Sequence, residues 1–174
     1  MVLAFKEWSY IVDALGKGLQ NIIFRKGGIA EEEGHFTVKG NKFILFPTLF
    51  HQAAKSVKPD WLSKLDGEQF HTQPNHVKIE YYAQVLEQRL ISDWAVIEKF
   101  YNHHAWTNDI IEERYNRWEK NVNLLLVQVY KLPVPTVISL KPEYEGCKSW
   151  IELDEEIALA GKPIIPQAIK GSYF

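Results

Sequence analysis

The sequence predicts an α+β fold with a small mixed or mainly antiparallel sheet and flanking helices. Three observations lead to this prediction. Residues 122–131 are apolar on both sides, as in a buried strand. Two segments, near residues 93–102 and 109–119, carry apolar side chains at helical spacing. Strands and helices do not alternate regularly, which argues against a parallel βαβ protein. About five or six strands are expected, enough to close a small barrel or to form a strongly curled sheet.

The N-terminal segment predicts a helix followed by a strand. Apolar side chains recur at helical spacing at Ala4, Trp8, Ile11 and Leu15. We therefore expect a helix over residues 4–15, ended by Gly16. Residues 19–25 are apolar enough for a short buried strand.

A β-hairpin is predicted at residues 35–46. Phe36 and Val38 alternate with polar residues, and Gly40-Asn41 is a suitable two-residue turn. The returning segment is apolar on both faces, so we expect it to be an interior strand. Beyond it, Thr48 is expected to cap a short helix that stops before Pro59.

The second half predicts a further strand at residues 77–85, although the segment from Tyr82 onward also fits a helix. Asp109 and Glu112 have the spacing of a capping box for the helix at 109–119. Pro133 and Pro135 are expected to end the strand at 122–131. The remaining expectations are a strand at 136–140, a short helix at 154–160 and an irregular tail at 162–166.

Length and composition favour one domain spanning residues 1–174. Twenty basic and 22 acidic residues give a net charge of −2, which excludes a global polycation built to hold nucleic acid. No segment resembles a signal peptide, and no apolar run is long enough to span a bilayer. With its single cysteine, the chain is expected to be cytoplasmic, away from membranes.

The clearest concentration of hydrogen-bond donors is the stretch Arg25, Lys26, Gly27 and Gly28. Arginine binds phosphate through two hydrogen bonds, and paired glycines let the backbone approach an anion. The alternative is a loop in which the glycines serve only the backbone conformation of a turn. No dinucleotide-binding or phosphate-loop motif is present.

Metal and nucleophile patterns are weak. His103 and His104 are adjacent, so on a helix they point in different directions, and no zinc-binding spacing occurs. The acidic run at residues 31–33 is best explained as a solvated loop. Cys147 is expected to be a small buried residue rather than a nucleophile. We predict no metal and no cofactor, and no residue is identified as catalytic.

The chain is rich in aromatic residues. Trp8, Phe36, Phe43 and Trp118 fall on predicted apolar faces and are expected in the core. Trp106 and Trp150 lie in predicted loops beside polar residues. These two tryptophans are the candidates for exposure in a cleft.

Five short motifs are spread over nearly the whole chain: FKEW at 5–8, RKGGI at 25–29, FPTLFHQ at 46–52, HHAWT at 103–107 and GCKSW at 146–150. With these motifs the chain resembles a bacterial family of unknown function. The resemblance implies a stand-alone domain and brings no activity.

A second resemblance is to ASCH domains of the PUA-like barrel group. Such domains have an early helix, a Gly-x-Lys turn and a strand ending in arginine. Here the turn is Gly16-Lys17-Gly18 and the strand ends at Arg25. The acidic residue that such domains have before the arginine is absent, because residues 21–24 contain no acid. The resemblance implies a small barrel with a cleft near Arg25 and an RNA or nucleotide ligand.

Two hypotheses for a small-molecule or nucleic-acid site follow. In the first, the domain binds a nucleotide or single-stranded nucleic acid, with Arg25, Lys26 and Lys6 on phosphate and an exposed Trp or Tyr stacked on a base. In the second, the protein is a hydrolase with a cleft formed by Glu7, Arg25, His51 and His104. A third hypothesis is a protein-interaction module with an exposed aromatic patch. The sequence leaves the oligomeric state open.

Overall fold

The computed structural model describes residues 1–26, 36–49 and 53–167. In this part of the chain one sheet has seven strands in the order β2-β5-β4-β3-β1-β6, with β7 paired to β5 outside that order. The strands are β1 (Val2–Trp8), β2 (Ile22–Arg25), β3 (Lys42–Thr48), β4 (His76–Ile91), β5 (Val122–Ser139), β6 (Trp150–Leu153) and β7 (Lys162–Pro163). The α-helices are α1 (Ser9–Gly16), α2 (Pro59–Leu62), α3 (Trp94–Glu98) and α4 (Asn108–Asn116). Short 3₁₀ turns are η2 (Ala53–Ser56), η3 (Glu68–Phe70), η4 (Tyr101–His103) and η5 (Pro142–Tyr144).

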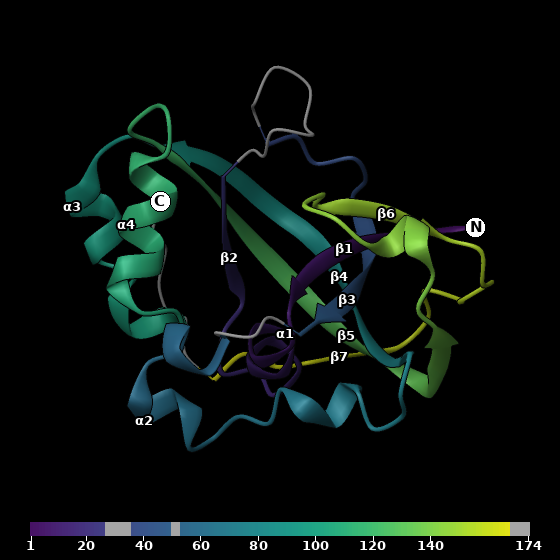
Figure 1. The fold of residues 1–174 in the computed structure, drawn as a ribbon. Helices are drawn as coiled ribbons and strands as arrows, with labels where there is room; N and C mark the ends of the chain where they lie inside the picture. The colour runs from purple at the N-terminus through teal and green to yellow at the C-terminus, as the bar shows by residue number, and fades with distance from the viewer. Residues whose placement is uncertain (27–35, 50–52, 168–174) are drawn as a thin grey trace.

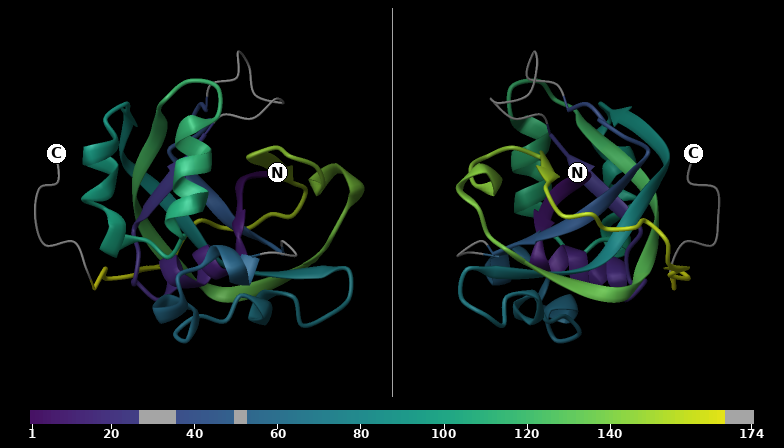
Figure 2. Two further views of the ribbon diagram at one scale, coloured as in Figure 1. Left: turned by 60° about the vertical axis from the view of Figure 1, so that its left-hand side comes forward. Right: turned by 90° about the vertical axis from the view of Figure 1, so that its right-hand side faces the viewer.

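The sheet is mixed, which confirms the α+β class. β1 and β3 run parallel, and the other strand pairs are antiparallel. β4 and β5 form a long pair across the molecule, with α3 and α4 beside β2 at one end and β6 at the other (Figure 1). Two register shifts between β4 and β5 accompany their bending, visible in Figure 2. Among the described residues the end strands β2 and β6 do not pair, so the predicted barrel does not close.

The core lies on both faces of β1 and β3. Phe5, Phe43 and Leu45 belong to the larger apolar cluster, which also contains residues of α1. The neighbouring residues Ala4 and Ile44 belong to a smaller cluster. Because successive side chains in a strand point to opposite faces, each of these strands is buried on both faces. This confirms that the segment after Asn41 is an interior strand.

The predicted N-terminal helix is half wrong. Residues 2–8 form β1, and only Ser9–Gly16 is helical; the predicted end at Gly16 is confirmed. The helical spacing of Ala4 and Trp8 was coincidental. β1 lies between β3 and β6 and has no solvent-exposed face, so its sequence lacks the regular alternation of apolar and polar residues that would reveal a strand.

The predicted hairpin is also wrong. Residues 36–40 are not a strand, and β3 pairs with β1 and β4 instead. Thr48 is the last residue of β3 rather than a helix cap. Residues 53–56 form a 3₁₀ turn, and Pro59 begins α2 instead of ending a helix. Proline is tolerated in the first turn because its missing N–H has no helical partner there.

In the second half the elements mostly stand where expected, with different lengths. β4 extends from His76 to Ile91, so the helical alternative from Tyr82 is wrong. α3 and α4 confirm the two predicted helices, but α4 begins after Thr107 without a side-chain cap. β5 continues through both prolines to Ser139. Residues 154–160 are not helical, and the tail contributes β7. In the described ranges, no helix has the length and apolar character that crossing a membrane requires.

Candidate functional site

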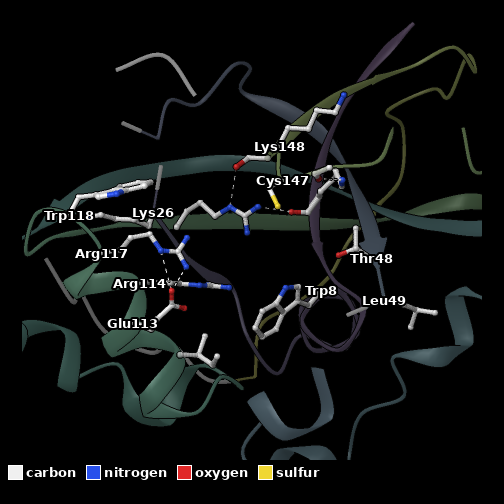
Figure 3. Close-up of a pocket in the computed structure, with 15 residues that line it drawn as sticks. Trp8, Lys26, Thr48, Leu49, Glu113, Arg114, Arg117, Trp118, Cys147 and Lys148 are labelled. Carbon is white, nitrogen blue, oxygen red and sulfur yellow. Dashed lines mark hydrogen bonds and ion pairs between the residues drawn. The ribbon is translucent and has the colours of Figure 1, made fainter. Parts of the chain in front are cut away.

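A cavity of about 780 Å³ opens where β1, β2, β3 and α4 end near one another. Lys6 and Trp8 come from β1, Arg25 ends β2, and Thr48 ends β3. The parallel register pairs Trp8 with Thr48, which aligns these two strand ends. The chain around Arg114 and the loop at residues 146–149 complete the wall (Figure 3). The volume is within the usual range for a small-molecule site, roughly 300–1,000 Å³.

The lining is strongly basic. Its cations are Lys6, Arg25, Lys26, Arg114, Arg117 and Lys148, and the one lining carboxylate among the described residues is Glu113. These six side chains come from four separate segments of a chain whose net charge is −2. The fold therefore assembles a local positive field that composition does not reveal.

A buried carboxylate stands behind this lining. Glu7 is 1% exposed, and its Oε1 accepts a hydrogen bond of 2.8 Å from the Trp8 amide. Its Oε2 lies 3.6 Å from Nη1 of Arg25 and accepts no hydrogen bond from any described residue. Glu7 also acts electrostatically on Arg114. One carboxylate thus faces two guanidinium groups.

Arg114 forms the deepest cationic part of the cavity. The residue is 8% exposed, and its guanidinium donates a 2.7 Å hydrogen bond to the Phe24 carbonyl. The guanidinium carbon lies 4.8 Å from the ring centre of Trp106 and 5.2 Å from that of Trp8. Burial lowers the pKa of Arg114 to about 10, and the Glu7 charge opposes this effect. The group is therefore still cationic at neutral pH.

Arg25 is held in a fixed orientation. It donates to Oγ of Ser149 at 3.4 Å and to the Lys6 carbonyl at 3.1 Å. Its guanidinium also lies 4.8 Å from the ring centre of Phe5. These contacts make Arg25 a structural link between β2, β1 and the 146–149 loop as well as a charge in the lining.

The two predicted lysines are partly engaged by backbone carbonyls. Lys6 Nζ donates to Tyr144 at 2.7 Å and Gly146 at 2.8 Å. Lys26 Nζ donates to the carbonyls of Glu119 and Asn121. Burial lowers the pKa of both amines, and for Lys6 the Lys148 charge adds to the effect. Both lysines fix loops at the cavity wall.

The rim carries the more accessible charges. Arg117 pairs with Glu113, and both side chains are largely exposed. Lys148 is exposed and has no ion pair with any described residue. These rim cations can reorient toward a ligand at little cost.

The tryptophan predictions are largely reversed. Trp118, expected in the core, is 57% exposed and lies at the cavity, and the half-buried Trp8 also lines it. Trp106 and Trp150, expected in a cleft, are 0% and 7% exposed. Both lie in the larger apolar cluster, because the loops that carry them fold inward.

Trp118 also has an unusual backbone. Its φ is +61°, in the left-handed region that costs an ordinary residue roughly 1–2 kcal/mol. A bulky, exposed side chain in this conformation gains little packing in return. Such outliers concentrate where a side chain is needed for binding.

The remaining predicted residues lie elsewhere. His104 lines a separate cavity of about 260 Å³ beside α3, and burial lowers its pKa to about 3. Gly27, Gly28 and His51 lie outside the described residues. The structure thus brings Lys6, Arg25 and Lys26 to one cavity, with Glu7 behind it, and separates His104 from them. Among the described residues, no cluster of three or more His, Cys, Asp or Glu side chains is suited to a metal.

Cys147 is exposed and lines the basic cavity, contrary to the expected burial. Gly146, which precedes it, has a φ of +85°, so the chain turns there and keeps the thiol at the surface.

Sequence reasoning missed Arg114, Arg117, Trp118 and Lys148. A signal was present for the first of these. Arg114 lies four residues before Trp118, so in a helix over 109–119 it shares the face on which Trp118 was expected to pack into the core. A cation on an apolar helix face requires a partner or a ligand.

A comparison with protein families matches residues 4–169 to a family described as a domain of unknown function, DUF1802. Neither the curated proteins nor the solved structures contain a match to this chain. The family match agrees with the expected membership of a family of unknown function and covers nearly the whole chain. It does not bear on the ASCH and PUA-like resemblance.

Proposed function

We propose that this chain, which belongs to the DUF1802 family, binds a nucleotide or single-stranded nucleic acid in the basic cavity. The observation that carries the proposal is the meeting of six cations and two tryptophans around one cavity of about 780 Å³. Phosphate groups would contact the cations, and a base would stack on an indole ring.

The charge of the cavity lining favours an anionic ligand. A cavity with six cationic side chains and one carboxylate attracts anions over the range of the Debye length, about 8 Å at physiological salt. Arginine suits phosphate because its planar guanidinium donates two parallel hydrogen bonds. Three of the six cations are arginines.

The exposed indole of Trp118 favours nucleotides over simple anions. Inorganic anions need no exposed indole, whereas every nucleobase has a face that can stack. Trp118 offers such a face at the rim and is 57% exposed. Stacking is worth about 1–3 kcal/mol per base and tolerates any base.

The test is binding of ATP and of short RNA and DNA oligomers, measured by calorimetry over a salt titration. Arg117→Ala and Lys148→Ala change exposed rim residues, so the fold should persist. The matched control is Lys64→Ala, an exposed lysine outside the cavity. Arg25→Ala is less informative, because Arg25 also links three segments.

We expect affinity to fall as salt rises from about 50 to about 200 mM, and each rim variant to reduce the logarithmic slope by about 0.7. The Lys64→Ala protein should match the wild type. Salt-independent affinity, or equal losses in the rim and control variants, would overturn the proposal.

A further inference from the structure

We infer that the cavity recognises a terminal phosphate monoester of a nucleotide or oligonucleotide, with the phosphate at Arg114 and the adjoining base on Trp118. This inference rests on the proposed function and specifies which part of the ligand enters. It follows from the depth at which the charges lie, from their balance and from the position of Trp118.

The lining is arranged by depth. Arg114, at 8% exposure, and Ser149 are buried, whereas Arg117, Trp118 and Lys148 are exposed. Figure 3 shows Arg114 extending from the α4 side toward Trp8, with Trp118 and Lys148 both above it in the view. A ligand that reaches Arg114 must therefore insert one end. The middle of a polynucleotide lying across the rim would not bring a phosphodiester to a side chain that is nine-tenths covered.

Arg114 has hydrogen-bond donors that no described residue uses. A guanidinium carries five N–H donors, and among the described residues only the Phe24 carbonyl accepts a hydrogen bond from this one. The side chain lines the cavity although little of it reaches solvent. Unused donors on a buried cation are costly unless a ligand accepts from them.

The charge balance at depth favours a doubly charged group. Arg25 and Arg114 lie close enough to affect each other electrostatically, and Glu7 faces both. Lys6 also lines the cavity and interacts electrostatically with Arg25, so three cations and one carboxylate leave an excess of two positive charges. A phosphate monoester carries about −1.5 to −2 charges at neutral pH, more than the single charge of a diester. A terminal phosphate therefore matches this excess better than a backbone phosphate does.

The rim position of Trp118 sets the orientation. With the phosphate inside, the base of the same nucleotide lies toward the opening, where Trp118 is exposed in its left-handed conformation. The strained backbone places the indole at the rim, where it gains little packing within the fold. Lys148 and Arg117 then stand near the following phosphates of a longer ligand.

The experiment compares matched probes by calorimetry on the full chain. The probes are adenosine against AMP, and an adenosine hexamer with hydroxyl ends against hexamers phosphorylated at the 5′ or at the 3′ end. We expect AMP and at least one phosphorylated hexamer to bind at least about tenfold more tightly than their unphosphorylated counterparts, as loss of a charged hydrogen-bond partner predicts.

Two variants locate the contacts. Trp118→Ala should weaken AMP binding about tenfold, and Trp118→Tyr should restore most of it, since a phenol ring still stacks. Arg114→Lys keeps the charge but loses the paired donors, and should remove the preference for the terminal phosphate. Because Arg114 is buried, circular dichroism must first show that this variant is folded; the Trp118 variants test the inference independently.

The outcomes separate the two proposals. Hexamers that bind equally with and without a terminal phosphate would overturn this inference and leave nucleic-acid binding standing. Failure of every probe to bind would overturn both. AMP binding that Trp118→Ala does not change would refute the assigned orientation of the base.

Discussion

Replacing Glu7 by glutamine tests the arrangement beneath the cavity most directly. Glutamine keeps the size of the side chain and an oxygen for the Trp8 amide, but it removes the negative charge that faces Arg25 and Arg114. We expect Glu7→Gln to lower the free energy of unfolding by about 3 kcal/mol, as breaking a buried ion pair does.

The magnitude follows from the geometry. Opposite unit charges 3.6 Å apart attract each other by about 5 kcal/mol at an effective dielectric constant of about 20. Arg114 adds to this attraction. The cost of burying the carboxylate, which is 1% exposed, offsets part of it, and glutamine escapes that cost. A net loss of about 3 kcal/mol remains, at the lower end of what broken buried pairs show.

The assay is urea unfolding of the wild type, Glu7→Gln and a matched control, Glu113→Gln. Glu113 pairs with Arg117, but its side chain is 56% exposed, so its loss should change stability by less than about 1 kcal/mol. A loss below about 1 kcal/mol in Glu7→Gln would refute the assignment of Glu7 as the buried counter-charge. The same variant should bind AMP more tightly, because the guanidiniums have lost their competing carboxylate.

Three other predictions concern the rest of the fold. Burial holds the pKa of His104 at about 3, so the unfolded chain binds a proton near pH 6.5 that the folded chain excludes. The free energy of unfolding should therefore be highest above about pH 6.5 and fall as the pH drops toward 3. Urea unfolding at a series of pH values should show that His104→Phe lacks most of this fall. A Cβ on Gly16 would lie 2.4 Å from the Tyr81 ring, so Gly16→Ala should cost about 1–3 kcal/mol; an unchanged melting temperature would contradict this packing. Cys147 should react with a maleimide in the folded protein, and AMP should slow the reaction, whereas equal rates would place its binding elsewhere.

Two strands that the sequence predicted correctly have a clear local signal, an apolar run at 122–131 and alternating apolar residues at 77–85. The segment at 122–131 belongs to β5, and 77–85 belongs to β4. Pro133 and Pro135 did not end β5, because they fall where the register between β4 and β5 shifts, between the pairs Ile79–Thr136 and Tyr81–Lys131. Proline needs no ladder hydrogen bond at such an irregularity. No local sequence pattern predicts such an irregularity, because it depends on how β4 pairs with β5.

The N-terminal errors have a different cause. β1 takes its partners from residues 42–48 and 150–153, far along the chain. Local spacing carries no information about such pairing, and tertiary contacts override helix propensity. Trp106 and Trp150 were misjudged for the same reason, since their burial depends on segments that are distant in sequence.

About half of the cations at the candidate site could be predicted from the sequence. Lys6, Arg25 and Lys26 were chosen from local chemistry, and they line one cavity. Arg114, Arg117 and Lys148 could not be grouped with them, because only the position of α4 and of the 146–149 loop brings them near. An even spread of charge along a chain therefore conceals a concentration of charge in space.

The position of β1 between β3 and β6 has a consequence for biosynthesis. A ribosome makes Val2–Trp8 long before it makes the antiparallel partner Trp150–Leu153. At translation rates of 5–20 residues per second this delay is on the order of 10 s. Throughout that interval one edge of β1 lacks its partner, and an unpaired strand edge is prone to mispairing and aggregation. Lys148 and Ser149 directly precede this partner strand, so the cavity is completed only after this stretch of the chain has been made.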